Sequence, residues 1–216
     1  MKMRAIAAAI AAPFLPASPF RAIGRTMHTH TRIFSMTLLA LSLIFVGPVF
    51  AQRPQAVMDT ADHSGGWVGK TALPFTLTSS DGKATDLGRI IGTKPVVLIF
   101  YRGVWCPFCH SQMADLSRHR AEFQRSGAAV YAISNEDAAK LNQMRDGEKL
   151  DFVSFLSDPD GAAAKKYAGL YPGSMTHQPG SFVIDKGGKI VYAYVNQDYK
   201  SRAATTAMLQ AVRRSK

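Results

Sequence analysis

The clearest pattern along the chain is an apolar run that gives way to helical spacing. Residues 95–101 read PVVLIFY, and such a β-branched and aromatic run, closed by Gly103, predicts a buried strand. From residue 109 on, apolar positions recur at the spacing of a helix, which Gly127 is expected to end. The residues predicted to share one face of this helix are Met113, Leu116, Arg120 and Phe123.

Similar strand and helix patterns alternate over the rest of the chain. This alternation predicts parallel strands joined by helical crossovers. Near the C-terminus, two apolar runs flank the turn KGGK at residues 186–189, which predicts an antiparallel hairpin. We therefore expect an α/β domain with a mixed central sheet and helices on both faces. The further strands are expected at 74–78, 129–134, 152–156, 181–185 and 190–195, and the helices at 86–91 (a single turn), 136–149 (with Asn135 as N-cap), 162–168 and 202–213.

Composition and charge fit one globular domain and give no sign of a nucleic-acid binder. The 216 residues are 47% hydrophobic and 19% charged, with a formal net charge of +11. Residues 1–51 hold five basic residues and no acidic one, so 21 basic and 15 acidic residues remain from residue 52 on, a net charge of +6. These charges are scattered and no nucleic-acid-binding motif accompanies them. We expect no nucleic-acid partner.

The N-terminal residues have the layout of a secretory signal. An apolar stretch at 37–50 follows Arg32, and small residues precede a cleavage point after Ala51. We expect residues 1–51 to be a signal peptide, 52–66 a flexible lead-in and 67–216 the folded domain. The predicted location is periplasmic or secreted.

Two alternatives to this leader stay open. An uncleaved anchor is one, although residues 37–50 are fewer than the roughly 20 that a spanning helix needs and contain Gly47-Pro48. A later start, at Met27 or Met36, is the other. After cleavage we expect no stable insertion in the membrane.

Both cysteines of the chain, Cys106 and Cys109, stand where the predicted strand ends and the helix begins. The first turn of a helix has unpaired N–H groups and the positive end of the helix dipole, which lower a thiol pKa from about 8.5 toward roughly 3.5–7.5. Pro107 fits the first turn, where a missing N–H has no cost. Cys109, one turn along, can resolve a mixed disulfide. An inert disulfide is the alternative, but so short a loop would constrain the unfolded chain little.

Three stretches carry a family resemblance: residues 97–109 (VLIFYRGVWCPFC), 156–161 (LSDPDG) and 182–186 (FVIDK). Together with the order of predicted elements, they resemble the AhpC/TSA family, the peroxiredoxin branch of the thioredoxin fold. The resemblance covers about residues 67–213 and implies a thioredoxin-like fold with a redox-active thiol.

The chain also departs from the family pattern, in which Pro-x-x-x-Thr/Ser-x-x-Cys and a distant Arg hold the peroxide. Aligned on residues 100–101, Cys109 falls at the peroxidatic position, Cys106 replaces the Thr/Ser and Arg102 replaces the Pro. The family's Arg near the hairpin is missing. By its likeness to thioredoxins, the stretch HQPGSF makes Pro179 a candidate cis-proline whose neighbouring backbone could pair with a substrate chain.

These residues support a leading and a second hypothesis. The first is dithiol–disulfide exchange, in which Cys106 attacks and Cys109 resolves, with Arg102 adding positive potential and Trp105 packing beside the site. The second is a thiol peroxidase, in which Cys109 becomes a sulfenic acid and Cys106 condenses with it. The expected partner is accordingly a redox protein or a peroxide.

A third hypothesis is haem attachment, because Cys-x-x-Cys-His also matches the c-type haem pattern with His110 as axial ligand. A metal site built from the cysteines with His110, His119 or His177 is a poor fit, since a structural zinc site needs four ligands in recognisable spacing. We expect neither a cofactor nor a metal.

Overall fold

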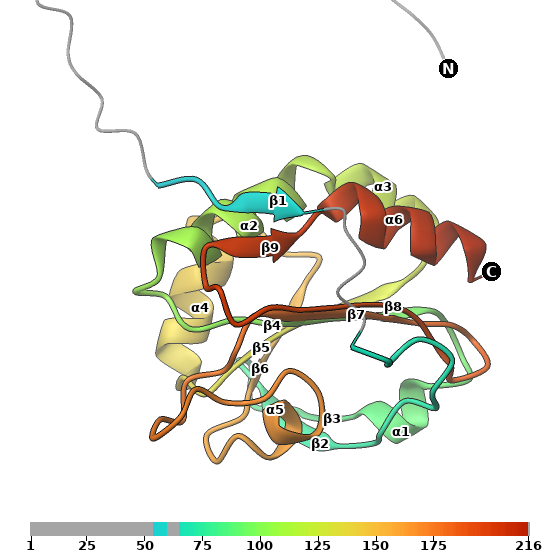
Figure 1. The fold of residues 1–216 in the computed structure, drawn as a ribbon, viewed down its shortest axis with the longest axis horizontal. Helices are drawn as coiled ribbons and strands as arrows, with labels where there is room; N and C mark the ends of the chain where they lie inside the picture. Colours follow the sequence, from blue (N-terminus) through green and yellow to red (C-terminus); the bar gives the residue numbers. More distant parts are fainter. Residues whose placement is uncertain (1–53, 60–64, 216) are drawn as a thin grey trace, which may run out of the picture. The chain divides into compact units, whose positions relative to one another are not determined.

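The computed structural model describes residues 54–59 and 65–215 (Figure 1). The predicted signal peptide lies outside these residues. Within them, no helix combines the length and the apolar character that crossing a membrane requires.

A seven-stranded mixed sheet forms the centre of the domain. Its strands are β2 (Thr76–Ser79), β3 (Ala84–Asp86), β4 (Val96–Phe100), β5 (Ala129–Ser134), β6 (Ser154–Ser157), β7 (Gly180–Ile184) and β8 (Ile190–Val195). They lie in the order β3-β2-β6-β5-β4-β7-β8. Strand β5 is parallel to both β4 and β6, whereas β7 is antiparallel to both β4 and β8. The mixed sheet predicted from the sequence is confirmed.

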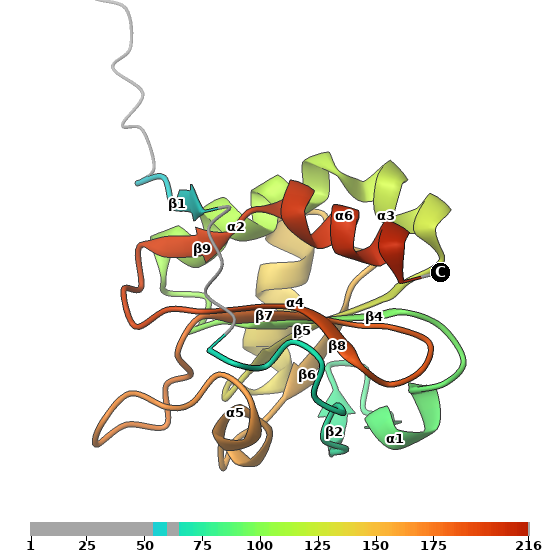
Figure 2. The same cartoon turned by 45° about the vertical axis from the view of Figure 1, so that its right-hand side comes forward.

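Helices cover both faces of the sheet (Figures 1 and 2). The helices are α1 (Leu87–Ile90), α2 (Pro107–Arg118), α3 (Arg120–Ser126), α4 (Ala138–Gly147), α5 (Ala162–Lys166) and α6 (Thr205–Arg214). Buried side chains of α2, α3, α4 and α6 join one hydrophobic core, and those of α1 and α5 join a second core.

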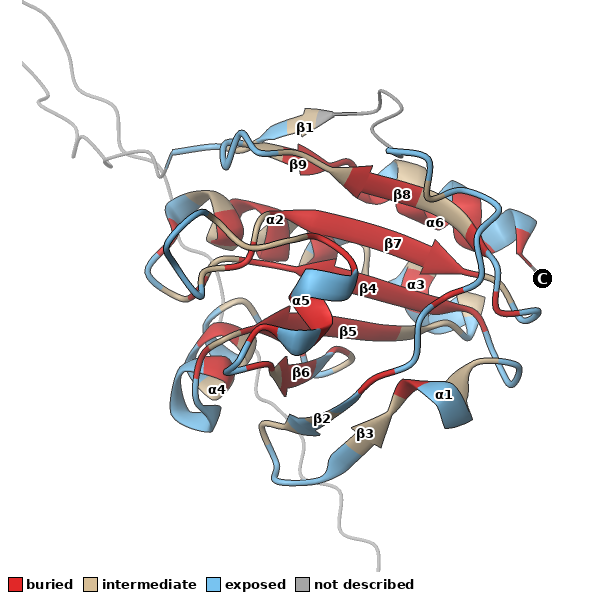
Figure 3. Cartoon of the chain, turned by 60° about the horizontal axis from the view of Figure 1, so that its bottom comes forward, coloured by how far each residue is buried: buried red, intermediate tan, exposed pale blue. Residues whose placement is uncertain are grey.

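Strand β4 separates the two cores, because successive side chains of a strand point to opposite faces. Every residue of β4 is buried, while the edge strand β3 and its neighbour β2 are partly exposed (Figure 3). Burying each large apolar side chain contributes roughly 1.5–3 kcal/mol, so β4 is a rigid base for the residues that follow it. Val97, Ile99 and Tyr101 face the first core, and Val96, Leu98 and Phe100 face the second.

The predicted cysteine helix is broken at His119, which corrects the single helix expected up to Gly127. The His119 ring nitrogen Nδ1 lies 2.9 Å from the carbonyl oxygen of Asp115, the acceptor that its own backbone N–H would use in a continuous helix. The His119 N–H donates instead to the Leu116 carbonyl at 3.0 Å. Gly127, with φ of +70°, ends α3 as predicted.

The start of α4 also differs from the expectation. Asp137, and not Asn135, is the N-cap, and its side chain accepts a hydrogen bond from the Lys140 N–H at 3.0 Å. Either residue type suits a cap, so the choice depends on where the chain leaves β5.

A second, two-stranded sheet was not predicted. It pairs β1 (Val57–Asp59) with β9 (Ser201–Ala203) in parallel. Strand β1 lies within the predicted lead-in 52–66, next to Ala56, whose N–H donates to the Ser111 hydroxyl on α2 at 3.0 Å. Strand β9 occupies the start of the helix predicted at 202–213, so α6 begins only at Thr205.

Candidate active site

The loop between β4 and α2 is tightly packed at Gly103. This glycine has φ of +150°, and a Cβ atom there would lie 2.5 Å from Nε1 of Trp105 and 2.8 Å from Oε1 of Glu136. Only a glycine fits this backbone and this space.

Val104, the next residue of the loop, has side-chain partners at both its backbone N–H and its backbone carbonyl. The Val104 N–H donates to the two carboxylate oxygens of Glu136 at 2.9 and 3.1 Å. The Val104 carbonyl lies 2.6 Å from Nε2 of His110, whose Nδ1 lies 2.7 Å from a carboxylate oxygen of Glu148. Since both ring nitrogens of His110 face protein acceptors, neither is free to bind iron, and the haem hypothesis gains no support.

The two cysteines lie at the start of α2, as predicted. Cys106 is the N-cap, Pro107 is the first helical residue, and the Cys109 N–H donates to the Cys106 carbonyl at 3.0 Å. The Cys106 sulfur makes no capping hydrogen bond, so it stays available for chemistry. Both cysteines are free thiols with no solvent-exposed surface.

The surroundings of the two thiols shift their pKa values in opposite directions. A hydrogen bond donated by the Cys109 thiol is the main cause that lowers the pKa of Cys106 to about 6, against the effect of burial. The Cys109 N–H and the guanidinium groups of Arg202 and Arg102 add to this lowering. Burial, followed by the hydrogen bond to Cys106, raises the pKa of Cys109 well above its usual value. The pair therefore holds one proton on Cys109 and a thiolate on Cys106 at neutral pH.

Arg202 of β9 is a site residue that the sequence analysis missed. Its side chain is fully buried, and Nη2 lies 3.7 Å from Sγ of Cys106 and 3.4 Å from Sγ of Cys109. Nη1 donates to the carbonyl oxygens of Tyr199 and, at 3.0 Å, of Ser201. The absence of the family's arginine near the hairpin was the one available signal, because it left the thiolate without a cation.

Arg102, a predicted supporting residue, lies at the rim of the site. Its guanidinium carbon is 4.6 Å from the ring centre of Trp105, 4.5 Å from that of Tyr199 and 5.3 Å from that of Tyr171. Such contacts are attractive because the face of an aromatic ring is electronegative. Trp105 is 56% exposed and Tyr199 is 37% exposed, so the rim is an aromatic surface around the buried sulfurs.

The prediction of a cis bond at Pro179 is wrong, because no peptide bond of the described residues is cis. Pro179 is buried, and its carbonyl accepts a hydrogen bond from the Asn196 N–H at 3.3 Å. The preceding Gln178 N–H donates to the Gly169 carbonyl at 3.0 Å. The protein's own loops thus occupy the backbone groups that were expected to pair with a substrate chain.

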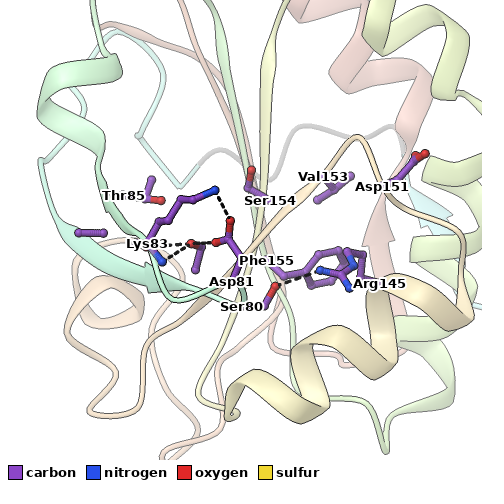
Figure 4. A pocket seen from close by; sticks show the side chains of 11 residues that line it. Ser80, Asp81, Lys83, Thr85, Arg145, Asp151, Val153, Ser154 and Phe155 are labelled. Atoms are coloured by element: carbon purple, nitrogen blue, oxygen red, sulfur yellow. Dashed lines mark hydrogen bonds and ion pairs between the residues drawn. The ribbon is translucent and has the colours of Figure 1, made fainter.

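A hollow of about 360 Å³ between the β2–β3 turn, β6 and the end of α4 contains none of the predicted site residues (Figure 4). Of the basic groups in its lining, Lys83 pairs with Asp81 at 2.9 Å and Arg145 with Asp146 at 2.8 Å. These cations are already neutralised, so the hollow offers no evident anion site. Among the described residues, no group of three or more metal-type ligands occurs.

Comparisons with known proteins agree with this fold. The AhpC/TSA family model matches residues 68–193. Peroxiredoxin Q of rice (Oryza sativa subsp. japonica) is 34% identical over 135 residues, which cover 60% of this chain and 59% of the relative. A putative peroxiredoxin of Mycobacterium tuberculosis is 34% identical over 137 residues, with coverage of 59% and 84%. The chain spans about three fifths of the length of the rice relative.

Solved structures show the same fold at lower identity. The crystal structure of peroxidoxin BcpB from Mycobacterium tuberculosis superposes with a TM-score of 0.60 at 24% identity, covering 69% of this chain and 97% of that one. Enterococcus faecalis AhpC gives a TM-score of 0.61 at 19% identity, covering 69% and 92%. The chain therefore belongs to the AhpC/TSA family and has the thioredoxin-like fold of the peroxiredoxins.

Proposed function

We propose that the protein is a two-cysteine thiol peroxidase in which Cys106 attacks the peroxide and Cys109 resolves the product. The peroxiredoxin names of its relatives support peroxide as the substrate. The single feature that carries the assignment of roles is the difference between the surroundings of the two sulfurs, which raise the pKa of Cys109 and lower that of Cys106, so that Cys106 is the thiolate. A thiolate, and not a thiol, is the nucleophile in such chemistry.

The proposed reaction has two steps. The Cys106 thiolate attacks one oxygen of the peroxide, the O–O bond breaks, and the leaving oxygen takes a proton to form an alcohol or water. Cys106 is then a sulfenic acid, and the Cys109 sulfur attacks it to form a disulfide with release of water. An external thiol reductant must return two electrons to the disulfide. Arg202 contacts both sulfurs and can stabilise the charge on either one.

These roles are the reverse of those that the family alignment implies. The alignment places Cys109 at the peroxidatic position, but burial opposes a negative charge on Cys109. Cys106, which occupies the family's Thr/Ser position, receives the hydrogen bond from the Cys109 thiol, whereas Arg202 acts on both sulfurs.

Peroxide consumption by single-cysteine variants tests the proposal. Cys106→Ser should lose rapid peroxide consumption, whereas Cys109→Ser should consume about one equivalent and stop as the sulfenic acid. Wild-type consumption no faster than that of free cysteine would contradict the peroxidase proposal. Full activity in Cys106→Ser would contradict the assignment of roles.

Dithiol–disulfide exchange is the second candidate, and the Cys-x-x-Cys pair at the start of α2 favours it. The complete burial of both sulfurs favours a small oxidant over a protein disulfide. Reduction of insulin by the protein separates the two candidates, since a peroxidase of this kind should be slow in that assay.

Export also stays a proposal, which rests on the apolar stretch 37–50 and the predicted cleavage after Ala51. N-terminal sequencing of the mature protein from the producing cell tests it. A mature chain that begins at Gln52 is expected, and a chain that retains residues 37–50 would contradict cleavage.

A further inference from the structure

Two arginines next to the dithiol lack an acidic partner. No carboxylate of the described residues lies within ion-pair distance of Arg102 or Arg202. Glu136, the carboxylate facing the same loop, is occupied by the Val104 N–H. The Nε atoms of both arginines are also buried without a hydrogen-bond acceptor. A buried donor without an acceptor is unfavourable, so the protein itself leaves the hydrogen-bonding capacity of both arginines partly unsatisfied.

The charge balance of the site changes with its redox state. In the reduced protein, the Cys106 thiolate offsets one of the two guanidinium charges. In the disulfide, neither sulfur is charged, and both guanidinium charges are left without a counter-charge. The oxidised protein is therefore the state that attracts an anion most strongly.

The geometry points to an anionic reductant: we propose that a small thiol bearing a carboxylate reduces the Cys106–Cys109 disulfide, with its carboxylate bound by Arg102. The guanidinium carbon of Arg102 lies 4.6 Å from the ring centre of Trp105 and 4.5 Å from that of Tyr199, and no carboxylate of the described residues pairs with it, so its charge is available to a carboxylate ligand. The complete burial of both sulfurs favours a small thiol over a protein thiol.

The reaction takes two thiolates and one proton. The first thiolate attacks Sγ of Cys106, the Cys106–Cys109 bond breaks, and Cys109 leaves and takes the proton. The second thiolate attacks the small-molecule sulfur of this mixed disulfide. The small disulfide is released, and Cys106 leaves as the thiolate that its surroundings stabilise.

A series of small thiols tests this inference without any peroxide. The protein is oxidised with stoichiometric diamide, and reduction of its disulfide is followed with mercaptopropionate, with the primary amide of mercaptopropionate and with cysteamine. Rates are compared per thiolate and corrected for the dependence of thiolate nucleophilicity on thiol pKa, which is measured with a small uncharged disulfide as the reference substrate. At low ionic strength, mercaptopropionate should react about tenfold faster than its amide, and cysteamine should be the slowest. High salt should reduce these differences.

Two variants locate the effect. Arg102→Gln should remove most of the preference for mercaptopropionate over its amide. Lys70→Gln, which removes another cation stacked on an aromatic ring, 5.3 Å from the centre of Trp67, should leave the preference unchanged. Equal rates for mercaptopropionate and its amide in the wild type, or an unchanged preference in Arg102→Gln, would overturn the inference.

This inference rests on the proposed function only in requiring the Cys106–Cys109 disulfide. The two fail separately, because peroxide consumption tests the function and reduction of a chemically prepared disulfide tests the reductant. A protein that consumes peroxide rapidly but shows no preference among the thiols would overturn the inference alone.

Discussion

The dithiol site and the hollow between the β2–β3 turn, β6 and α4 differ in how their charges are balanced. In the hollow, Lys83 and Arg145 each have an acidic neighbour at 2.9 and 2.8 Å. Around the dithiol, Arg102 and Arg202 face sulfur atoms, aromatic rings and backbone carbonyls. Basic residues alone thus do not mark a site in this protein, whereas basic residues without acidic partners do.

The stability of the reduced protein should depend on pH because of the dithiol. The pKa of Cys106 lies at about 6 in the folded protein and at 9.0 without the fold's influence, so the unfolded chain binds more protons between these values. Stability should therefore rise as pH increases from about 6 to 9 and be lost as pH falls back toward 6. The gain is at most about 4 kcal/mol. Denaturant unfolding of the reduced protein across this range measures it.

Cys106→Ala is the control for this prediction, because it keeps every other titrating group of the protein. Its stability should rise less over the same pH range. Parallel curves for the two proteins would contradict a thiolate at Cys106.

Replacing one glycine by alanine in each region compares how tightly the two regions are packed. Both Gly103 and Gly82 have positive φ, so alanine brings backbone strain of roughly 1–2 kcal/mol at either position. A Cβ at Gly82 meets no atom within 4 Å, whereas one at Gly103 would clash with Trp105 and Glu136. Gly103→Ala should thus cost about 3 kcal/mol or more, and Gly82→Ala about 1–2 kcal/mol, in unfolding experiments. Equal losses would mean that the Gly103 loop can relax without cost.

Removing the buried cation should slow the chemistry. Arg202→Met should raise the pKa of Cys106 and lower its rate of reaction with peroxide at pH 7 by about tenfold or more, which is about 1.4 kcal/mol. Arg145→Met, the matched change in the hollow, should leave both unchanged. Fold integrity of both variants is checked by circular dichroism, and an unchanged pKa of Cys106 in a folded Arg202→Met protein would contradict the role of Arg202.

The smallest effect is expected in the hollow itself. A hydrogen bond from Ser79, with further contributions from Lys83, lowers the pKa of Asp81 to about 2, yet this pair is exposed to solvent. Exposed ion pairs contribute little to stability. Asp81→Asn should change neither the free energy of unfolding nor the peroxide rate beyond experimental error, and a large loss of either would break the contrast between the two regions.

Local patterns predicted the parts of the molecule that local forces determine. The apolar run of β4, the cysteines at the start of α2 and the β7–β8 hairpin depend on residues close in sequence, and all three are present. Arg202 could not be predicted, because it reaches Cys106 across 96 residues through the turn into β9. At Pro179, the hydrogen bond from the Asn196 N–H continues the predicted β7–β8 hairpin, whereas the bond from the Gln178 N–H to the Gly169 carbonyl depends on a turn that local patterns did not predict.

The break at His119 was missed for a different reason. Helical spacing continues through it, and only the contact of its ring with the Asp115 carbonyl interrupts the hydrogen bonds. Side-chain competition for backbone groups of this kind leaves no trace in hydrophobic periodicity.

The most direct test of the account is the pH dependence of alkylation of the reduced protein by iodoacetamide, with the modified cysteine identified by peptide mass spectrometry. Cys106 should be modified first, with a rate that rises through a midpoint near pH 6, while Cys109 stays unmodified. Prior modification of Cys109, or a midpoint near the pH of about 8.5 at which free cysteine titrates, would contradict the assignment of Cys106 as the reactive thiolate.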